Sequence, residues 1–291
     1  MDIFSPTQVL TGGYFSFLYH WIWPTSALKS GLAEKKLLSN INRDYKLGWI
    51  KLDKKRAINT LFIPAKNQKR VLVITHGYGV GLAYFSKTYP HLLSLVDEGT
   101  SIYAIDWLGM GRSSRVKIEG SRVEDVENYF IDSLEEWRDK MNIDKMTLFG
   151  HSLGGYLSTC YAIKYPNRLD KLILCSSAGF PEQIENNAPP SYLRRFFGYL
   201  WERSFTPQGI VRSLGPFGPR LLSNYTTRRF KNLDPEDLKN LHDYLYHITA
   251  DYGAGEYAIS HIFKPGAYAK SPLINRFHKV TVPTRFICTL N

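Results

Sequence analysis

Short apolar runs of strand length recur along the chain, and they alternate with longer segments of helical periodicity. Val71–Ile74 is a continuous apolar run, which is typical of a strand covered by helices on both faces of a parallel sheet. The runs predict strands at Leu47–Leu52, Asn59–Ile63, Arg70–Thr75, Ile102–Ile105, Met146–Phe149, Leu172–Cys175 and Thr284–Cys288. Helical patterns lie at Leu32–Leu38, Val123–Met141 and Tyr156–Tyr165. Strands that alternate with helices predict an α/β domain with a mainly parallel sheet.

The alternation of predicted strands and helices stops between Pro181 and Lys279, where helical, aromatic and basic segments are separated by glycine and proline. A helical cap on the sheet is expected there. We expect one domain with four parts, since α/β proteins of this length often fold as a single unit. These parts are an aromatic and basic N-terminal lead and candidate membrane anchor (1–40), an α/β core (41–180), the cap (181–279) and the start of a strand that returns to the core (280–291).

The formal net charge is +11, which favours contact with an anionic partner. No nucleic-acid motif is present, and aromatic residues accompany the basic ones in segments such as Tyr192–Phe197. This pattern suits an anionic lipid surface better than a nucleic acid. An ordinary solvated basic surface is the alternative, and the sequence leaves it open.

Three further features bear on where the protein resides. No stretch reaches the roughly 18 uncharged apolar residues that a membrane-spanning helix requires, so we expect peripheral contact with membranes. The run Tyr14–Pro24 is a poor signal peptide and is either an interfacial anchor or packed on the protein's own surface. Cys160, Cys175 and Cys288 lack metal-ligand spacing, so we expect no disulfide framework, no metal site and an intracellular setting.

The segment Gly150-His151-Ser152-Leu153-Gly154 directly follows a predicted strand and precedes a predicted helix. A Gly-x-Ser-x-Gly sequence in this setting is typical of a nucleophile elbow, a sharp turn that lifts the serine hydroxyl out of the sheet. The glycines are needed because such a turn leaves no room for Cβ atoms beside the serine. The motif alone is weak, but its strand-turn-helix setting predicts that Ser152 is the catalytic nucleophile.

A second loop, His76-Gly77-Tyr78-Gly79, begins where the Val71 strand ends. It matches the loop that supplies one oxyanion-hole donor in enzymes with a nucleophile elbow. We expect the backbone N–H groups of Tyr78 and Leu153 to stabilise the oxyanion, at about 3 kcal/mol per donor. A plain tight turn is the alternative interpretation of this loop.

Asp106 directly follows the strand at Ile102–Ile105 and opens a glycine-rich segment. In hydrolases with a nucleophile elbow, the triad acid comes after the nucleophile along the chain. We therefore interpret Asp106 as a structural carboxylate that braces its loop, in preference to a triad acid.

The motifs resemble one subfamily of α/β hydrolases. Its members are the comparative-gene-identification lipase coactivator, N-acylphospholipid lipases, fungal cardiolipin deacylases and plant lysophosphatidic acid acyltransferases. In the predicted core, the resemblance rests on the motifs His76–Gly79, Gly109–Ser114, Glu135–Arg138 and Gly150–Gly155. The predicted cap carries more specific motifs that look most like the plant members: Ala178–Glu182, Trp201–Gln208, Gly215–Pro219, Tyr225–Thr227 and Tyr244–His247. The resemblance spans nearly the whole chain and implies an α/β-hydrolase fold with a helical cap.

The resemblance also implies acyl-ester chemistry on phospholipids or lysophospholipids, as hydrolysis or as acylation of lysophosphatidic acid. The coactivator branch has lost the serine that is present here as Ser152, so the enzymatic branches are favoured. No bound cofactor is expected, and acyl-CoA is the candidate co-substrate. We expect a cytoplasmic protein that is peripheral on membranes or lipid droplets, with a mitochondrial location as an alternative.

The chain departs from the subfamily pattern after the strand at Thr284. Subfamily members continue into a Gly-x-x-Asp-Trp segment with the triad acid and a His-x-x-x-x-Asp segment with the triad histidine, and the 291 residues contain neither. Removal of triad members costs several powers of ten in rate. We therefore expect a nearly inactive chain that lacks the last strand and helix of the fold, with the Thr284 strand as an exposed edge. His247 is a weaker candidate for a substitute base, and the alternative function is an impaired lipid-surface adaptor that regulates a lipase.

Overall fold

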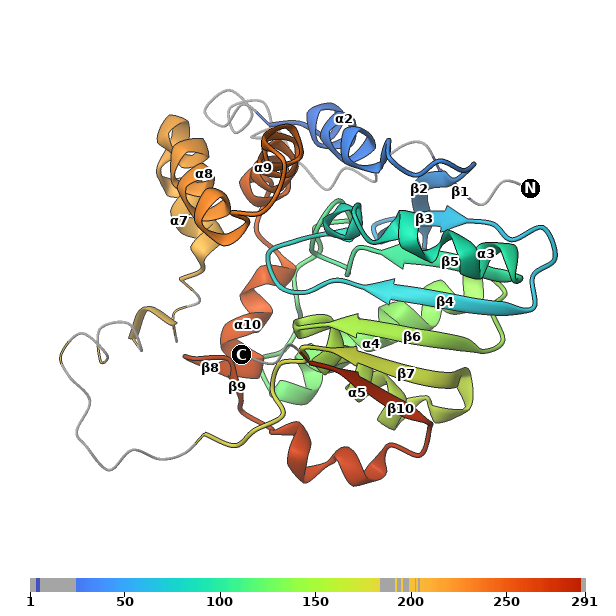
Figure 1. Cartoon of the computed structure of the whole chain (residues 1–291). Coiled ribbons are helices and arrows are strands. Elements are labelled where there is room, and N and C mark those ends of the chain that lie inside the picture. Colours follow the sequence, from blue (N-terminus) through green and yellow to red (C-terminus); the bar gives the residue numbers. More distant parts are fainter. Residues whose placement is uncertain are drawn as a thin grey trace.

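The computed structural model describes residues 4–5, 25–183, 192, 195, 199–201, 203 and 205–288 (Figure 1). The α-helices are α2 (Ala27–Leu38), α3 (Leu93–Asp97), α4 (Val123–Lys140), α5 (Leu153–Lys164), α7 (Pro207–Ser213), α8 (Gly218–Arg229), α9 (Pro235–Ala250) and α10 (Ala258–Ile262). The strands are β1 (Phe4–Ser5), β2 (Lys46–Lys51), β3 (Ala57–Ile63), β4 (Arg70–Thr75), β5 (Thr100–Ile105), β6 (Met146–His151), β7 (Leu169–Cys175), β8 (Phe263–Lys264), β9 (Tyr268–Ala269) and β10 (Thr284–Ile287). The 3-10 helices are η1 (Leu82–Phe85), η2 (Tyr89–Leu92), η3 (Pro166–Arg168), η4 (Gly215–Phe217), η5 (Gly255–Tyr257), η6 (Leu273–Asn275) and η7 (Phe277–Lys279).

The main sheet has the strand order β1-β2-β3-β5-β4-β6-β7-β10 in the described part of the chain. The pairs from β5 through β4, β6 and β7 to β10 are parallel, whereas β1, β2 and β3 join the sheet in antiparallel fashion. The prediction of a mainly parallel sheet is confirmed. Parallel neighbours bring the carboxyl ends of β4, β5, β6 and β7 to one edge of the sheet, where ligands bind in folds of this type.

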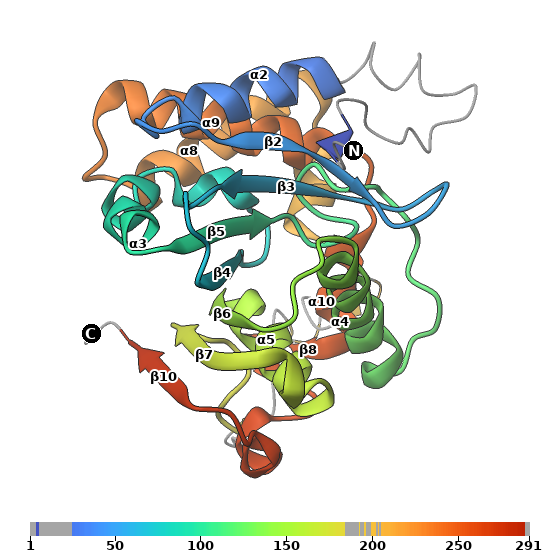
Figure 2. The same ribbon diagram turned by 90° about the vertical axis from the view of Figure 1, so that its right-hand side faces the viewer.

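Both faces of the sheet are covered, which explains the continuous apolar runs in the sequence. Val71 and Val73 of β4 pack in one core with residues of α4 and α5. Leu72 and Ile74 of the same strand pack in a second core with residues of α2, α3 and α9. Figure 2 shows α3 and α4 on opposite sides of the sheet, with α2 and α9 above β2 and β3. Full burial of one such side chain stabilises the fold by about 1.5–3 kcal/mol.

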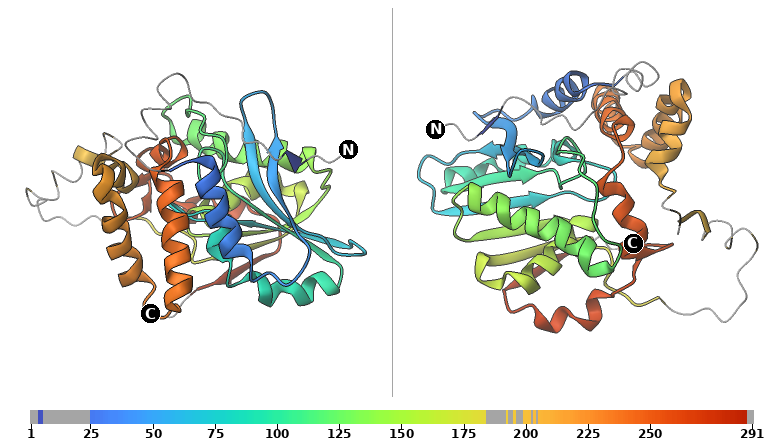
Figure 3. Two further views of the ribbon diagram at one scale, coloured as in Figure 1. Left: turned by 90° about the horizontal axis from the view of Figure 1, so that it is seen from above. Right: turned by 180° about the vertical axis from the view of Figure 1, so that it is seen from behind.

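Three helices, α7, α8 and α9, form a layer beyond the carboxyl ends of β4 and β6, toward which the strand arrows point in Figure 1. They lie inside the stretch predicted as a cap. Seen from above in Figure 3, α8, α9 and α2 lie next to one another. Helix α2 packs on α9, and just before α2 the Thr25 Oγ1 donates a hydrogen bond to the His247 carbonyl oxygen of α9 (3.3 Å). The N-terminal helix is therefore part of the folded body.

Two helix starts differ from the predicted ones. The helix expected from Leu32 begins at Ala27, because Ser26 Oγ caps it by accepting the Lys29 N–H (3.2 Å). The helix expected from Tyr156 begins at Leu153, directly after Ser152. Its first turn holds two glycines, which have low helix propensity and therefore gave no helical signal.

The C-terminal strand β10 pairs with β7 and lies at the edge of the described sheet, as expected. Phe286 and Ile287 are each 51% exposed on it. The aromatic run Tyr14–Trp23 and most of the segment Tyr192–Phe197 lie outside the described residues. Among the helices that are described, none is long and apolar enough to cross a membrane. The described residues also contain no group of three or more His, Cys, Asp or Glu side chains placed to hold a metal ion.

Candidate active site

Ser152 occupies the turn between β6 and α5. Its backbone has a φ of +54° and a ψ of −117°, a conformation that is uncommon for a residue with a side chain. The Ser152 N–H donates to the Cys175 carbonyl (3.1 Å), and the Ser152 carbonyl accepts the N–H groups of Gly155 (3.0 Å) and Ala178 (3.1 Å). Such strained backbone persists only where the surroundings hold it, and it clusters at functional sites. The predicted strand-turn-helix setting of this serine is therefore present.

Three glycines leave no space for side chains around this turn. A Cβ atom at Gly150 would lie 2.5 Å from the Gly154 carbonyl oxygen, and one at Gly154 would lie 2.6 Å from the His76 carbonyl oxygen. A Cβ atom at Gly155 would lie 2.6 Å from Ser177 Oγ. Helix α5 can therefore pack against the ends of β4 and β6 only through glycines, which confirms the steric reason given for the two motif glycines.

The loop that follows β4 lies directly beside the serine. A Cβ atom at Gly77 would be 3.0 Å from Ser152 Cβ, so the loop backbone passes along the serine side chain. Gly79 has a φ of +73°, which favours glycine. Between these glycines, the Tyr78 hydroxyl donates to Gln208 Oε1 (2.9 Å). The loop thus lies where an oxyanion donor is needed, and the roles of the two backbone N–H donors stay a prediction.

His76 braces this loop from within the core. Its Nε2 accepts the Trp107 N–H (3.1 Å), so Nδ1 carries the proton and donates to the Gly77 carbonyl (2.7 Å). The Trp107 indole N–H in turn donates to the His76 carbonyl (3.0 Å). Burial lowers the pKa of His76, which favours the neutral ring. Both ring nitrogens are therefore occupied, and His76 is not available as a base for the serine.

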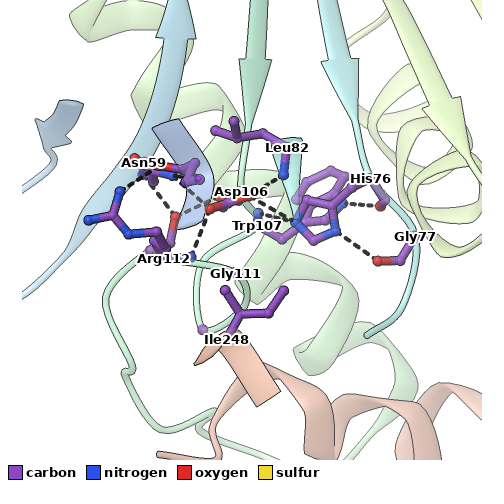
Figure 4. A network of polar contacts seen from close by, with 12 residues as sticks. Asn59, His76, Gly77, Leu82, Asp106, Trp107, Gly111, Arg112 and Ile248 are labelled. Atoms are coloured by element: carbon purple, nitrogen blue, oxygen red, sulfur yellow. Dashed lines mark hydrogen bonds and ion pairs between the residues drawn. The ribbon is translucent and has the colours of Figure 1, made fainter. Parts of the chain in front are cut away.

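Asp106 is a fully buried carboxylate that ties three segments together (Figure 4). Oδ1 accepts the Leu82 N–H (2.6 Å), and Oδ2 accepts Asn59 Nδ2 (2.8 Å) and the Arg112 N–H (2.7 Å). These bonds fix the loops after β4 and β5 to β3. The structure supports the interpretation of Asp106 as a bracing carboxylate.

His151 lines the same cavity as Ser152. Its ring stacks on Tyr84, with centroids 5.7 Å apart, and meets the edge of Phe85 at 6.1 Å. Nδ1 is buried and has no hydrogen-bond partner among the described residues. Burial lowers the pKa of His151, and the positive charge of Arg229 acts in the same direction. The ring is therefore neutral near pH 7.

The cavity in front of Ser152 has a volume of about 490 Å³, within the range of small-molecule sites. The helices supply Pro207, Gln208, Ile210, Val211, Leu221, Leu222, Tyr225, Arg228, Arg229, Leu245 and Thr249 to its wall. Most of these side chains are apolar, which suits an acyl chain. The described lining contains no Asp or Glu, and two arginines carry its permanent charge. A larger hollow of about 750 Å³, lined in part by Arg43, Lys69 and Glu98, does not include the serine.

The sequence predicts a helical cap, but the cap residues that line the cavity beside Ser152 were not among the predicted site residues. Tyr84, Gln208, Arg228 and Arg229 were all missed. A signal existed for the arginines, because they directly follow the cap motif Tyr225–Thr227. The wall of a cavity nevertheless depends on how helices are rotated, and a single sequence does not give that rotation.

His247, the weaker candidate base, is not among the residues that line the cavity. Its Nδ1 lies 3.1 Å from Thr25 Oγ1, in the contact between α9 and the segment before α2. Within the described residues, no hydrogen bond joins the Ser152 hydroxyl to a histidine, and no carboxylate lines the cavity. The described geometry thus provides a serine and its loop, while the base is not among the contacts of that serine.

Comparison with known proteins adds a separate line of evidence. A family model described as alpha/beta hydrolase fold matches residues 70–229. The 1-acylglycerol-3-phosphate O-acyltransferase of Arabidopsis thaliana is 38% identical over 301 residues, which cover 93% of this chain and 70% of that protein. The 1-acylglycerol-3-phosphate O-acyltransferase ABHD5 of Rattus norvegicus is 35% identical, over 87% of this chain and 71% of that protein.

Solved structures show the same fold at low sequence identity. The carboxylesterase CesB of Bacillus subtilis matches with a TM-score of 0.59 and 14% identity, over 89% of this chain and 79% of that one. This likeness concerns the fold alone. Together with the family match and the identities above, it leads to one assignment. The chain belongs to the α/β-hydrolase family of enzymes, in the subfamily of these two acyltransferases.

Proposed function

We propose that the protein transfers a fatty acyl group to lysophosphatidic acid, or hydrolyses a related phospholipid acyl ester, through an acyl-Ser152 intermediate. The observation that carries the proposal is the position of Ser152, on a strained turn that opens into a mainly apolar cavity. The names of the two relatives support the choice of lysophosphatidic acid as the acceptor.

In the first half-reaction, Ser152 Oγ attacks the carbonyl carbon of an acyl-CoA thioester, and the hydroxyl proton passes to a base that the described contacts of Ser152 do not include. The tetrahedral intermediate collapses, the C–S bond breaks, and coenzyme A leaves as the thiol after it receives a proton. In the second, a hydroxyl of the lysophospholipid attacks the acyl carbon, the bond from that carbon to Ser152 Oγ breaks, and the proton of the attacking hydroxyl passes to Ser152. Attack by water in its place gives a free fatty acid. Backbone donors at Tyr78 and Leu153 would stabilise the oxyanion in both halves.

A second candidate function is a lipid-surface adaptor that regulates a lipase. It is favoured by the lack, among the described residues, of a hydrogen bond between Ser152 and a histidine. It uses the same fold and the same basic surface but requires no turnover. Both candidates act at an anionic membrane or lipid-droplet surface, which the net charge of +11 supports.

A fluorophosphonate probe, which reacts preferentially with an activated serine, separates the two candidates. The enzyme proposal expects covalent labelling of the 291-residue chain that is lost in Ser152→Ala. Ser213→Ala serves as the matched control, because Ser213 is exposed at the end of α7 and outside the cavity lining. Absence of labelling in the unchanged chain would favour the adaptor.

Labelled acyl-CoA then distinguishes transfer from hydrolysis. Incubation with lysophosphatidic acid is expected to give labelled phosphatidic acid in a Ser152-dependent manner. If labelled fatty acid is the only product, the protein is a hydrolase and the transferase part of the proposal is wrong.

A further inference from the structure

Two arginines in the cavity wall are not used by the acyl-transfer steps above. Arg228 and Arg229 form the last turn of α8, and both line the cavity that contains Ser152. Both residues are exposed, and neither forms an ion pair with a described residue. Arg228 Nε donates to the Asn224 carbonyl (3.2 Å). The two terminal nitrogens of the Arg228 guanidinium group can therefore donate to a ligand. Cations at a helix C-terminus stabilise the helix dipole, but this does not account for two guanidinium groups in a cavity wall.

Aromatic side chains connect these arginines with the serine. The Tyr84 ring stacks on His151, the neighbour of Ser152, and meets the Phe230 ring, the neighbour of Arg229, at 6.1 Å. Burial is the largest cause that lowers the pKa of His151, and the charge of Arg229 adds to it; at Tyr84, burial raises the pKa and the charge of Arg229 opposes it. The positive charge at the end of α8 therefore acts on two rings of the cavity lining, those of His151 and Tyr84.

The other residues that line the cavity indicate which kind of ligand fits. No acidic residue of the described lining offsets the two arginines, so the cavity attracts an anion. Guanidinium groups bind phosphate oxygens in bidentate fashion, which makes arginine pairs suited to phosphate monoesters. Apolar side chains such as Ile210, Val211 and Leu221 line the same cavity. A molecule with one phosphate and one acyl chain matches both features.

We propose that Arg228 and Arg229 form the subsite for the phosphomonoester of the acyl acceptor. Lysophosphatidic acid would bind with its phosphate at the end of α8 and its free hydroxyl toward Ser152. This inference rests on the proposed function and names the part of the site that selects a phosphorylated acceptor over a neutral monoacylglycerol.

The test is calorimetric binding of a short-chain lysophosphatidic acid and of the monoacylglycerol with the same acyl chain. The full chain is expected to bind the phosphorylated lipid at least about tenfold more tightly. The double variant Arg228→Gln/Arg229→Gln is expected to lose about tenfold in affinity for lysophosphatidic acid and to keep its affinity for monoacylglycerol. Arg220→Gln is the matched control, since Arg220 is exposed on the same helix but lies outside the lining.

Three results of these lipid titrations would overturn the subsite. They are equal binding of the two lipids by the unchanged chain, an unchanged preference in the double variant, and an equal loss of preference in Arg220→Gln. The Arg228→Lys/Arg229→Lys variant, which keeps the charge, is expected to recover part of the preference. Inorganic phosphate that competes as strongly as lysophosphatidic acid would assign the arginines to free phosphate and contradict the role of the lipid headgroup.

Acyl-transfer assays on the same variants separate this inference from the proposed function. Acceptor preference in binding without any acyl transfer would refute the transferase and leave the subsite intact. Transfer to lysophosphatidic acid that does not depend on either arginine would refute the subsite and leave the transferase intact.

Discussion

At the scale of single residues, a small set of buried polar groups supports the loops around Ser152. Glu34 of α2 is fully buried and accepts Arg112 Nη1 (2.5 Å) and Asn59 Nδ2 (2.9 Å). Asn59 also donates to Asp106, so the N-terminal helix is linked to the loops after β4 and β5. Burial is the largest effect on Glu34 and raises the pKa of its carboxyl group to about 7, although Arg112 opposes it. The support of the site is therefore sensitive to pH.

The variant Glu34→Gln is expected to change the pH dependence of folding. The pKa of Glu34 is about 7 in the folded state and 4.5 as its ordinary value, so the folded state binds more protons between these values. Glu34 therefore makes the free energy of unfolding fall as pH rises through this window. Denaturant unfolding at several pH values should show that the difference between Glu34→Gln and the unchanged chain varies with pH between about 4.5 and 7. A difference that is constant with pH would contradict the raised pKa.

Gly154→Ala is expected to destabilise the fold by about 1–3 kcal/mol, the usual cost of overpacking. The new Cβ atom would lie 2.6 Å from the His76 carbonyl oxygen and 2.7 Å from that of Thr75, both backbone atoms that cannot move aside. Thermal unfolding measures the effect. Gly209→Ala is the control, because its Cβ atom would come no closer than 3.2 Å, to a side-chain oxygen, and it lies in helix α7. Equal stability of the two variants would show that the elbow is not tightly packed.

At the scale of elements, the sequence predicts strands that are buried on both faces and helices with a regular apolar face, such as α4, but it does not show close packing at glycines or the inward faces of exposed helices. The strand Arg70–Thr75 was predicted with its observed bounds because helices cover both of its faces. The start of α5 was missed because its glycines serve close packing, which propensity does not register. The cavity wall was missed for a related reason: α7 and α8 expose much of their surface, so their inward faces carry a weak periodic signal.

The attachment of α7 gives a test at this scale. Arg212 Nη1 donates to the Thr249 carbonyl (2.9 Å) at the end of α9, and the guanidinium group pairs with the buried carboxylate of Glu256. Arg212→Met removes one partner of a buried pair, which typically costs about 3–5 kcal/mol. Urea unfolding is expected to show a loss of this size, whereas Arg220→Met on the exposed surface of α8 should change stability by less than about 0.5 kcal/mol. A comparable loss in both variants would mean that the pair with Glu256 does not anchor the helix.

At the scale of the whole molecule, charge and exposed apolar surface occur together around helix α8. Leu214 is 40% exposed and Phe217 is 71% exposed, next to helix α8 with its arginines. Exposed aromatic side chains beside basic residues suit the headgroup region of an anionic membrane. Contact with an anionic lipid surface, which the sequence favours, stays a prediction, and the place of these exposed side chains on the fold required the arrangement of α7, η4 and α8.

We expect the protein to bind anionic lipid vesicles through this surface. Phe217→Ser should reduce the fraction that floats with phosphatidylserine-containing vesicles, because it removes an exposed ring at that position. Ile274→Ser is the matched control, since Ile274 is 59% exposed in η6, outside the α7–α8 surface. Added salt should weaken binding, because screening reduces the attraction between the basic protein and the vesicle. If the two variants float equally well, and as well as the unchanged chain, membrane contact lies elsewhere. Deletion of residues 14–23 would then test the aromatic run as the anchor.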